Sequence, residues 1–225
     1  MQAWTPPAAG ESAPQLRAPG DWLWRLRAGC ARLLPPMKHL TVVRHAKSSW
    51  SQSGLPDHDR PLNDRGHRAA QAMGRFLHTT YLGGGSAEPL LPPVSKLVSS
   101  TALRALTTAQ IMRETFGLPQ DMLLLKQSLY LSSEDSLLNA VCEFDDAWEH
   151  VFLFGHNPGM QQLVDHLLAR ANMPRFPTCA VALLAFPVEH WALADWGKAQ
   201  LLGHITGRLL ERRFRDVYQS IRRYA

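Results

Sequence analysis

The chain has 225 residues, of which 45% are hydrophobic and 19% charged, and its formal net charge is +5. This composition is typical of a soluble globular protein with one domain or two small ones, and no apolar run is long enough to span a bilayer. The basic residues lie at the ends, because residues 1–36 carry a net +2 and residues 203–225 a net +4, which leaves −1 between them. A near-neutral centre does not favour nucleic-acid binding, so neither a nucleic-acid nor a membrane partner is expected.

The N-terminal residues 1–36 differ in composition from the rest of the chain. They are rich in Pro, Ala, Gly and Arg, show no sustained hydrophobic period and end at Pro35-Pro36. A disordered extension, an upstream translation artefact before a true start at Met37, and a targeting peptide remain open, and the absence of an apolar core disfavours the targeting peptide. We predict that 1–36 is a disordered or non-native extension and that 37–225 is the domain.

Strand and helix patterns alternate from Met37 onward, which predicts an α/β fold. Strands are expected at Leu40–Val43, Val94–Ser99, Met122–Leu125, Val151–Phe154, Cys179–Phe186, Trp191–Trp196 and Gln200–Leu202, the fifth and sixth as a possible hairpin. Helices are expected from a cap at Asn63 or Asp64 to about Tyr81, and at Ala102–Phe116, Glu134–Asp146, Met160–Leu168 and about 208–223. The last helix is basic and amphipathic, and we expect it to dock on the domain. This alternation predicts a three-layer αβα architecture with a mostly parallel central sheet.

Polar residues of one chemical kind follow three of the predicted strands. Arg44-His45 ends the first, Arg104 begins the helix after the second, and His156 follows the strand that ends at Phe154. The carboxyl ends of parallel strands meet at one edge of a sheet, so we expect these side chains to converge there. Two arginines, two histidines and nearby helix N-termini form a suitable pocket for a phosphoryl group.

Four motifs carry a resemblance to a known family. They are Arg44-His45-Ala46-Lys47-Ser48-Ser49-Trp50, Asp57-His58-Asp59-Arg60-Pro61-Leu62, Ser99-Ser100-Thr101-Ala102-Leu103-Arg104-Ala105 and Gly155-His156-Asn157-Pro158. In this order they resemble the histidine phosphatase (phosphoglycerate mutase-like) superfamily, and within it the SixA-type phosphohistidine phosphatase branch, over roughly residues 37–207. The resemblance implies the phosphoglycerate mutase-like fold and a phosphatase that forms a covalent phosphohistidine.

The resemblance also implies residue roles. His45 would be the nucleophile, Arg44 and Arg104 would hold the phosphoryl oxygens, and His156 would donate a hydrogen bond to them. Arg60 would be an added phosphate ligand in this branch. No metal or other cofactor is expected, because guanidinium groups supply the positive charge that phosphoryl transfer needs.

Ser48 is a candidate substrate-binding residue that could equally serve only to shape its loop. The three cysteines, Cys30, Cys142 and Cys179, are far apart and show no CxxC spacing, which disfavours both a disulfide framework and a zinc site. A cytoplasmic location is therefore expected.

The carboxylic acid with which many superfamily members protonate the leaving oxygen is absent from its expected position. The matching stretch is 128–133, and the nearest carboxylates, Glu134 and Asp135, remain candidates for that role. An alkoxide needs this proton, whereas an imidazole leaves readily, so its absence favours a phosphohistidine in a protein as substrate. A small phosphorylated metabolite, turned over by a phosphomonoesterase, and a non-catalytic phosphate-binding module are the alternatives, and the oligomeric state stays open.

Overall fold

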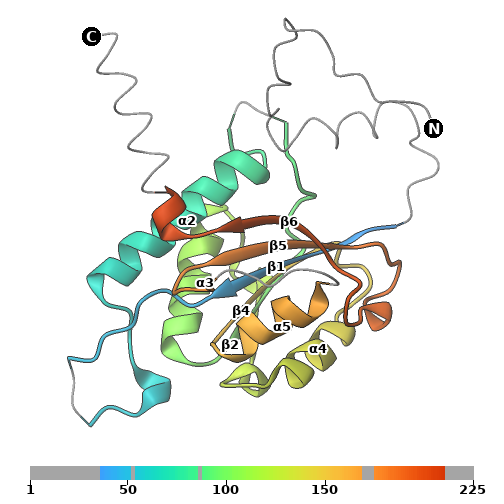
Figure 1. Cartoon of the computed structure of the whole chain (residues 1–225). Helices are drawn as coiled ribbons and strands as arrows, with labels where there is room; N and C mark the ends of the chain where they lie inside the picture. Colours follow the sequence, from blue (N-terminus) through green and yellow to red (C-terminus); the bar gives the residue numbers. More distant parts are fainter. Residues whose placement is uncertain (1–35, 52–53, 86–87, 169–174, 211–225) are drawn as a thin grey trace, which may run out of the picture. The chain divides into compact units, whose positions relative to one another are not determined.

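The computed structural model describes residues 36–51, 54–85, 88–168 and 175–210, and Figure 1 shows them in colour. The strands are β1 (Lys38–Arg44), β2 (Lys96–Ser100), β3 (Leu123–Lys126), β4 (His150–Gly155), β5 (Val181–Phe186) and β6 (Gln200–Ile205). The α-helices are α2 (Asp64–Tyr81), α3 (Leu103–Thr115), α4 (Glu134–Cys142) and α5 (Gly159–Leu167), and short 3₁₀ helices include η1 (Asp57–Asp59) and η4 (Trp191–Leu193). All described residues belong to one compact unit.

The six strands form one sheet in the order β3-β2-β4-β1-β5-β6. The pairs β2·β3, β2·β4 and β1·β4 are parallel, and the two pairs that β5 makes, with β1 and with β6, are antiparallel. The sheet is therefore mostly parallel, as the alternation of elements predicts. Because β4 lies between β1 and β2, the carboxyl ends of these three strands meet at one edge.

Helices cover both faces of this sheet, which gives the expected three layers. Helices α4 and α5 lie against one face and α2 and α3 against the other (Figure 1). Each face of the sheet has its own hydrophobic core. Strand β1 contributes to both, because Leu40 and Val42 pack on the side of α4 and α5 and Val43 packs on the side of α2 and α3. This alternation follows from the two-residue period of a strand that is buried on both faces.

The helix boundaries follow from capping chemistry. The side chain of Asn63 accepts a hydrogen bond from the Gly66 backbone at the start of α2, and Ser133 does the same for Ser136 at the start of α4. Helix α4 ends at Cys142, earlier than the expected Asp146. Most of the predicted C-terminal helix, about 208–223, lies outside the described residues. The part that is described, up to residue 210, belongs to a helical segment that begins at residue 207.

The strand predicted at Trp191–Trp196 is wrong, because this segment begins with the 3₁₀ helix η4 and joins no ladder of the sheet. Trp191 and Ala194 are buried whereas Leu193 is half exposed, a spacing of three that a helical turn satisfies and a strand does not. The Trp191 ring donates a hydrogen bond to the Trp148 carbonyl at 2.8 Å, which fixes the turn. The hairpin partner of β5 is β6 instead.

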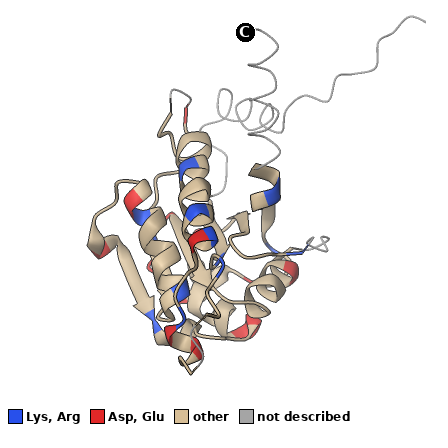
Figure 2. Cartoon of the chain, turned by 90° about the vertical axis from the view of Figure 1, so that its left-hand side faces the viewer, with Lys and Arg blue, Asp and Glu red and all other residues tan. Residues whose placement is uncertain are grey.

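None of the helices in the described ranges is both long and apolar enough to cross a bilayer. Basic and acidic side chains are interspersed on the face that Figure 2 shows.

Candidate active site

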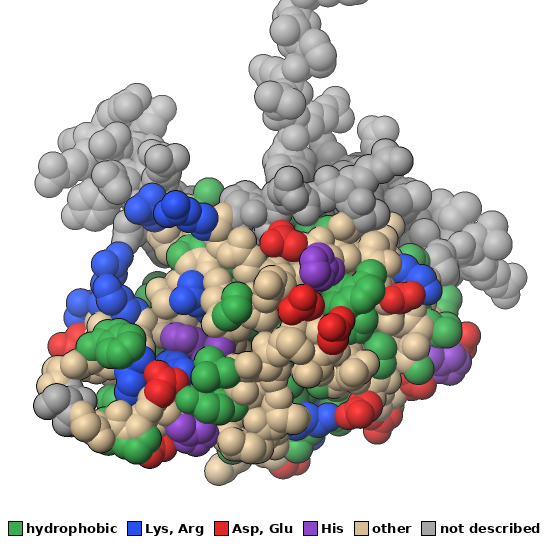
Figure 3. Space-filling model, turned by 60° about the horizontal axis from the view of Figure 1, so that its bottom comes forward, with side chains coloured by type: hydrophobic (Ala, Val, Ile, Leu, Met, Phe, Trp, Pro, Cys, Tyr) green, Lys and Arg blue, Asp and Glu red, His purple; other side chains and the backbone are tan. Residues whose placement is uncertain are grey.

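The residues that follow β1, β2 and β4 lie together at the carboxyl edge of the sheet. Arg44 pairs with Gly155 in the β1·β4 register, so the next residues, His45 and His156, are neighbours, with ring centroids 5.1 Å apart. Arg104 lies in the first turn of α3, after β2. The convergence expected from the sequence is therefore present in the fold. Figure 3 shows histidine side chains in a hollow bordered by basic, acidic and apolar groups.

His45 is buried and held in one tautomer. Its Nδ1 lies 2.7 Å from the carbonyl oxygen of Ala46, which can only accept, so Nδ1 carries the proton and Nε2 keeps its lone pair. Burial lowers the pKa of His45 to about 4, the hydrogen bond to Ala46 opposes this shift, and the charges of Arg104, Arg44 and Arg60 add to it. The imidazole is thus neutral at physiological pH, the state in which it can act as a nucleophile.

The loop after His45 is fixed by α3. The backbone N–H of Ala46 donates to the Thr108 hydroxyl at 3.0 Å, and that hydroxyl donates to the Arg104 carbonyl at 2.7 Å. This chain of bonds ties the residue after the first histidine to the helical turn that carries Arg104.

His156 lies beside His45 and is also neutral. Its Nε2 makes a hydrogen bond of 3.0 Å with the Ser100 hydroxyl, while its buried Nδ1 has no hydrogen-bond partner. Burial, together with the neighbouring His45 and the charge of Arg104, lowers the pKa of His156 to about 3. A buried ring nitrogen without a partner is available to a ligand.

Arg60 is folded over the same hollow by the loop that contains η1. Its guanidinium donates to the Ser48 hydroxyl at 2.7 Å, to the Ser49 carbonyl at 3.1 Å and to an Asp57 carboxylate oxygen at 2.8 Å. The indole of Trp50 stacks on it, with its centroid 3.2 Å from the guanidinium carbon. The structure therefore brings Arg60 and Ser48 together with His45 in one pocket.

Arg104 is held by the same carboxylate. One of its nitrogens donates to an oxygen of the Asp57 side chain at 2.8 Å and another donates to the Asp57 backbone carbonyl. The Tyr130 hydroxyl donates to the same carboxylate oxygen at 2.8 Å. Partial burial alone would raise the pKa of Asp57, but the hydrogen bonds from Tyr130, Arg60 and Arg104 outweigh it and hold that pKa at about 2.

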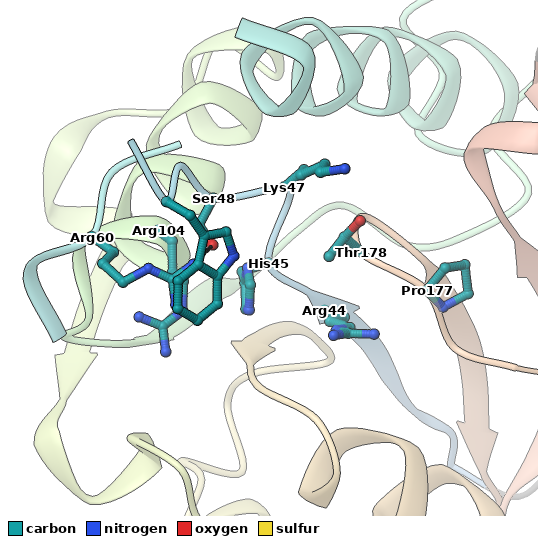
Figure 4. A pocket seen from close by; sticks show the side chains of 9 residues that line it. Arg44, His45, Lys47, Ser48, Arg60, Arg104, Pro177 and Thr178 are labelled. Atoms are coloured by element: carbon teal, nitrogen blue, oxygen red, sulfur yellow. Dashed lines mark hydrogen bonds between the residues drawn. The ribbon is translucent and has the colours of Figure 1, made fainter. Parts of the chain in front are cut away.

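Arg44 lies on the opposite side of His45 from Arg60 and Arg104 (Figure 4). It donates to the Phe176 carbonyl at 2.9 Å, and its buried Nε has no hydrogen-bond partner. The pocket between these groups measures about 460 Å³. It is lined by Arg44, His45, Lys47, Ser48, Trp50, Arg60, Arg104, Pro177 and Thr178.

The candidate acids from the sequence lie elsewhere. Glu134 and Asp135 form the first turn of α4, where negative charge suits the helix N-terminus, and they are not among the residues that line the pocket. Sequence reasoning assigned no role to Asp57 or Tyr130, although the spacing of Asp57 and Arg60, three residues apart, could have indicated their ion pair. In the ranges that the structure describes, no three His, Cys, Asp or Glu side chains are grouped to hold a metal ion.

The fold and this pocket define an αβα protein that places neutral histidines among arginines. The family model of the histidine phosphatase superfamily (branch 1) matches residues 40–123 of this chain. An uncharacterised protein of Mycobacterium tuberculosis is 29% identical over 170 residues, which span 72% of this chain and 97% of the relative.

Solved structures share the fold. The SixA protein of Nakamurella multipartitia superposes with a TM-score of 0.61 at 24% identity, over 76% of this chain and 96% of that one. A structure described as the protein histidine phosphatase SixA complexed with tungstate gives a TM-score of 0.61 at 18% identity, over 76% and 99% of the two chains. The phosphoglycerate mutase-like fold expected from the sequence is therefore confirmed.

Proposed function

We propose that this protein is a phosphatase that removes the phosphoryl group from phosphohistidine in a protein, through a covalent phosphohistidine on His45. The observation that carries the proposal is the neutral His45 imidazole, whose Nδ1–H is bound to the Ala46 carbonyl and whose Nε2 is free to attack, inside a pocket of arginines. The tungstate complex of a protein histidine phosphatase with this fold is in keeping with an oxyanion site.

The residues that line the pocket, together with His156, which lies beside His45 without lining it, divide the work of phosphoryl transfer. His45 attacks the phosphorus, and Arg44, Arg60 and Arg104 compensate the charge on the three equatorial oxygens. His156 has an unpartnered ring nitrogen with which to bind one of these oxygens. The Ser48 hydroxyl, which already binds Arg60, holds that guanidinium in place and is a further substrate-binding group.

Attack on phosphohistidine needs no acid at this site. The Nε2 lone pair forms the new P–N bond, the old P–N bond breaks, and its electron pair goes to the substrate nitrogen. A substrate ring that is protonated on its far nitrogen leaves as neutral imidazole. His45, which keeps its Nδ1 proton, becomes the phosphorylated imidazolium, so charge and protons balance. One P–N bond replaces another, which suits a pocket whose lining contains no carboxylic acid.

A phosphomonoester would place a different demand on the same pocket. Its alkoxide leaving group needs a proton in the transition state, and a positioned acid contributes about 10²–10⁴-fold to such a step. The one carboxyl group that contacts both Arg60 and Arg104, that of Asp57, is ionised at neutral pH because its pKa is held at about 2. It has no proton to donate.

Rates on two substrates test the proposal. We expect kcat/KM for a phosphohistidine peptide to exceed that for glucose 6-phosphate by about 100-fold or more, the size of the missing acid contribution. The variant His45→Ala should turn over neither substrate. A higher rate on the sugar phosphate would instead identify a small-molecule phosphomonoesterase, and binding without turnover of either would identify a phosphate-binding module.

We also propose the cytoplasm as the place of action. Two of the cysteines, Cys142 and Cys179, are described by the structure and both are free thiols. Reduced thiols suit that compartment.

A further inference from the structure

Hydrolysis of the phosphorylated His45 requires a proton to be removed from water, whereas formation of the phosphorylated His45 requires no such proton transfer. A water molecule must attack phosphorus as the P–Nε2 bond breaks, and the bond's electron pair returns to Nε2. His45 then leaves as the neutral imidazole with its proton still on Nδ1, so it takes up no proton. The attacking water must lose one, and hydrogen phosphate is the product. The second step therefore benefits from a base, whereas the first does not.

Asp57 is placed to meet this need. Its carboxylate binds Arg60 through one oxygen and Arg104 through the other, both at 2.8 Å. Asp57 does not itself line the pocket, but it contacts two of the arginines that do. The side chain is 45% exposed, which allows a proton to pass on to solvent. The backbone carbonyl of Asp57 also binds Arg104, and this contact holds the η1 turn when the carboxylate changes partners.

The hydrogen bonds of Asp57 in the structure determine how basic its carboxylate is, and their loss would make it more basic. With two arginines and Tyr130 bound to it, the pKa of Asp57 is about 2, so the group is ionised but weakly basic. A phosphoryl group in the pocket competes for both guanidinium groups. As they turn to its oxygens, Asp57 loses stabilising hydrogen bonds and gains a negatively charged neighbour, and both changes raise its proton affinity.

We propose that Asp57 is the catalytic base that accepts a proton from the water attacking phosphorylated His45. This inference rests on the proposed covalent mechanism. The carboxylate takes the water proton, hydrogen phosphate forms, and the protonated Asp57 then releases its proton to solvent. The rival explanation is that Asp57 only positions Arg60 and Arg104, in which case both phosphorylation and hydrolysis would depend on it.

Single-turnover kinetics separate these roles. His45 is phosphorylated with labelled acetyl phosphate, excess reagent is removed, and loss of label is followed over time. We expect Asp57→Asn to acquire label within about threefold of the wild-type rate but to lose it about 100-fold or more slowly. The matched control is Asp59→Asn in the same turn, because the Asp59 side chain is exposed and, among the described residues, its carboxylate bonds to His58 and to neither arginine. It should behave as wild type.

Two further variants report on the carboxylate itself. Asp57→Glu keeps a base and should lose label within about tenfold of the wild-type rate. In Asp57→Gly, added formate should accelerate the loss of label, which a merely structural role would not produce.

Three results would overturn the inference: wild-type loss of label in Asp57→Asn, equal slowing of both steps, or no effect of formate on Asp57→Gly. Failure of the wild-type protein to acquire label on His45 would instead overturn the covalent mechanism itself. The two failures are thus distinguishable.

Discussion

Arg104 is oriented before any substrate arrives. It is 4% exposed and bound by both the side chain and the backbone of Asp57, so little of its freedom remains to be lost on binding. A charged donor restrained in this way needs only to turn from the Asp57 carboxylate to the phosphoryl oxygens, and charge compensation by such donors is the larger part of what phosphoryl transfer requires. The same bonds restrain the η1 turn that carries the base proposed for hydrolysis.

Removing this guanidinium should reduce transition-state stabilisation strongly. We expect Arg104→Ala to lower kcat/KM on a phosphohistidine peptide by about 10²–10³-fold, the loss typical for one preorganised donor. Arg75→Ala, a change at an exposed arginine of α2, is the control for lost charge and should stay within about twofold of wild type. A near-normal kcat/KM in Arg104→Ala would show that Arg104 does not stabilise the transition state.

A candidate site residue can be located from the sequence alone when it directly follows a strand. His45, His156 and Arg104 occupy positions that the topology of a parallel sheet determines. The contacts of Asp57 with Tyr130, 73 residues apart, and of Trp50 with Arg60 depend on how the loops fold back. No periodic pattern encodes such contacts, so the sequence could not predict them.

The elements position the pocket through close backbone approaches. At the start of α2, the Cα of Gly66 lies against the loop that carries Lys47 and Ser48, so that a Cβ there would come within 2.2 Å of the Lys47 carbonyl oxygen. The same carbonyl accepts a hydrogen bond from the Asn63 backbone at 3.0 Å. The helix start therefore fixes the position of the loop that carries Lys47 and Ser48.

A methyl group at this position should displace the loop. We expect Gly66→Ala to destabilise the fold by about 1–3 kcal/mol, as overpacking does, and to lower phosphatase activity as the Ser48 loop shifts. Gly207→Ala is the matched control, since a Cβ there meets nothing within 4 Å. Thermal denaturation and kcat/KM measure both effects, and an unchanged melting temperature in Gly66→Ala would contradict the packing described.

The elements themselves were largely predictable. Six strands and four helices lie at the expected places, because strand runs and amphipathic helical periods are local signals. The exception, the segment from Trp191, has an apolar run whose partners lie far away in the chain: Trp191 binds the Trp148 carbonyl and the Asp146 carboxylate. Tertiary contacts, rather than local preference, decided its conformation.

At the scale of the molecule, the fold keeps three histidines buried and neutral. Burial lowers the pKa of His45 and of His150 to about 4 and that of His156 to about 3. His150 donates from Nδ1 to the Pro92 carbonyl and accepts at Nε2 from the Thr41 hydroxyl, which fixes its neutral form in the core. Because burial changes the pKa of each of these histidines, the free energy of unfolding depends on pH.

The direction of this linkage is set by the unfolded chain. There the histidines titrate near 6.5, so between about pH 6.5 and pH 4 the unfolded state binds more protons than the folded state, and stability falls as pH falls. We expect a loss of about 2 kcal/mol per buried histidine between pH 6.5 and pH 4.5, seen as a lower melting temperature. His156→Gln should reduce this acid sensitivity, whereas His67→Gln, at an exposed position of α2, should not. A melting temperature independent of pH over this range would contradict the burial.

The domain that carries the site should not need the N-terminal segment. Every residue that lines the pocket lies between Arg44 and Thr178, and none belongs to residues 1–36. We expect deletion of residues 1–36 to leave kcat/KM on a phosphohistidine peptide within about twofold of the full chain, since no pocket group is lost. A large loss of activity would show that the extension takes part in function.

The covalent mechanism proposed above requires that His45 carries a phosphoryl group. The most direct measurement is to react the full chain with a phosphohistidine peptide labelled on phosphorus, quench it, and locate the label by peptide mapping under alkaline conditions. We expect an acid-labile label on the peptide that contains His45, and none in His45→Ala. No label in the wild-type protein, or equal label in His45→Ala, would contradict it.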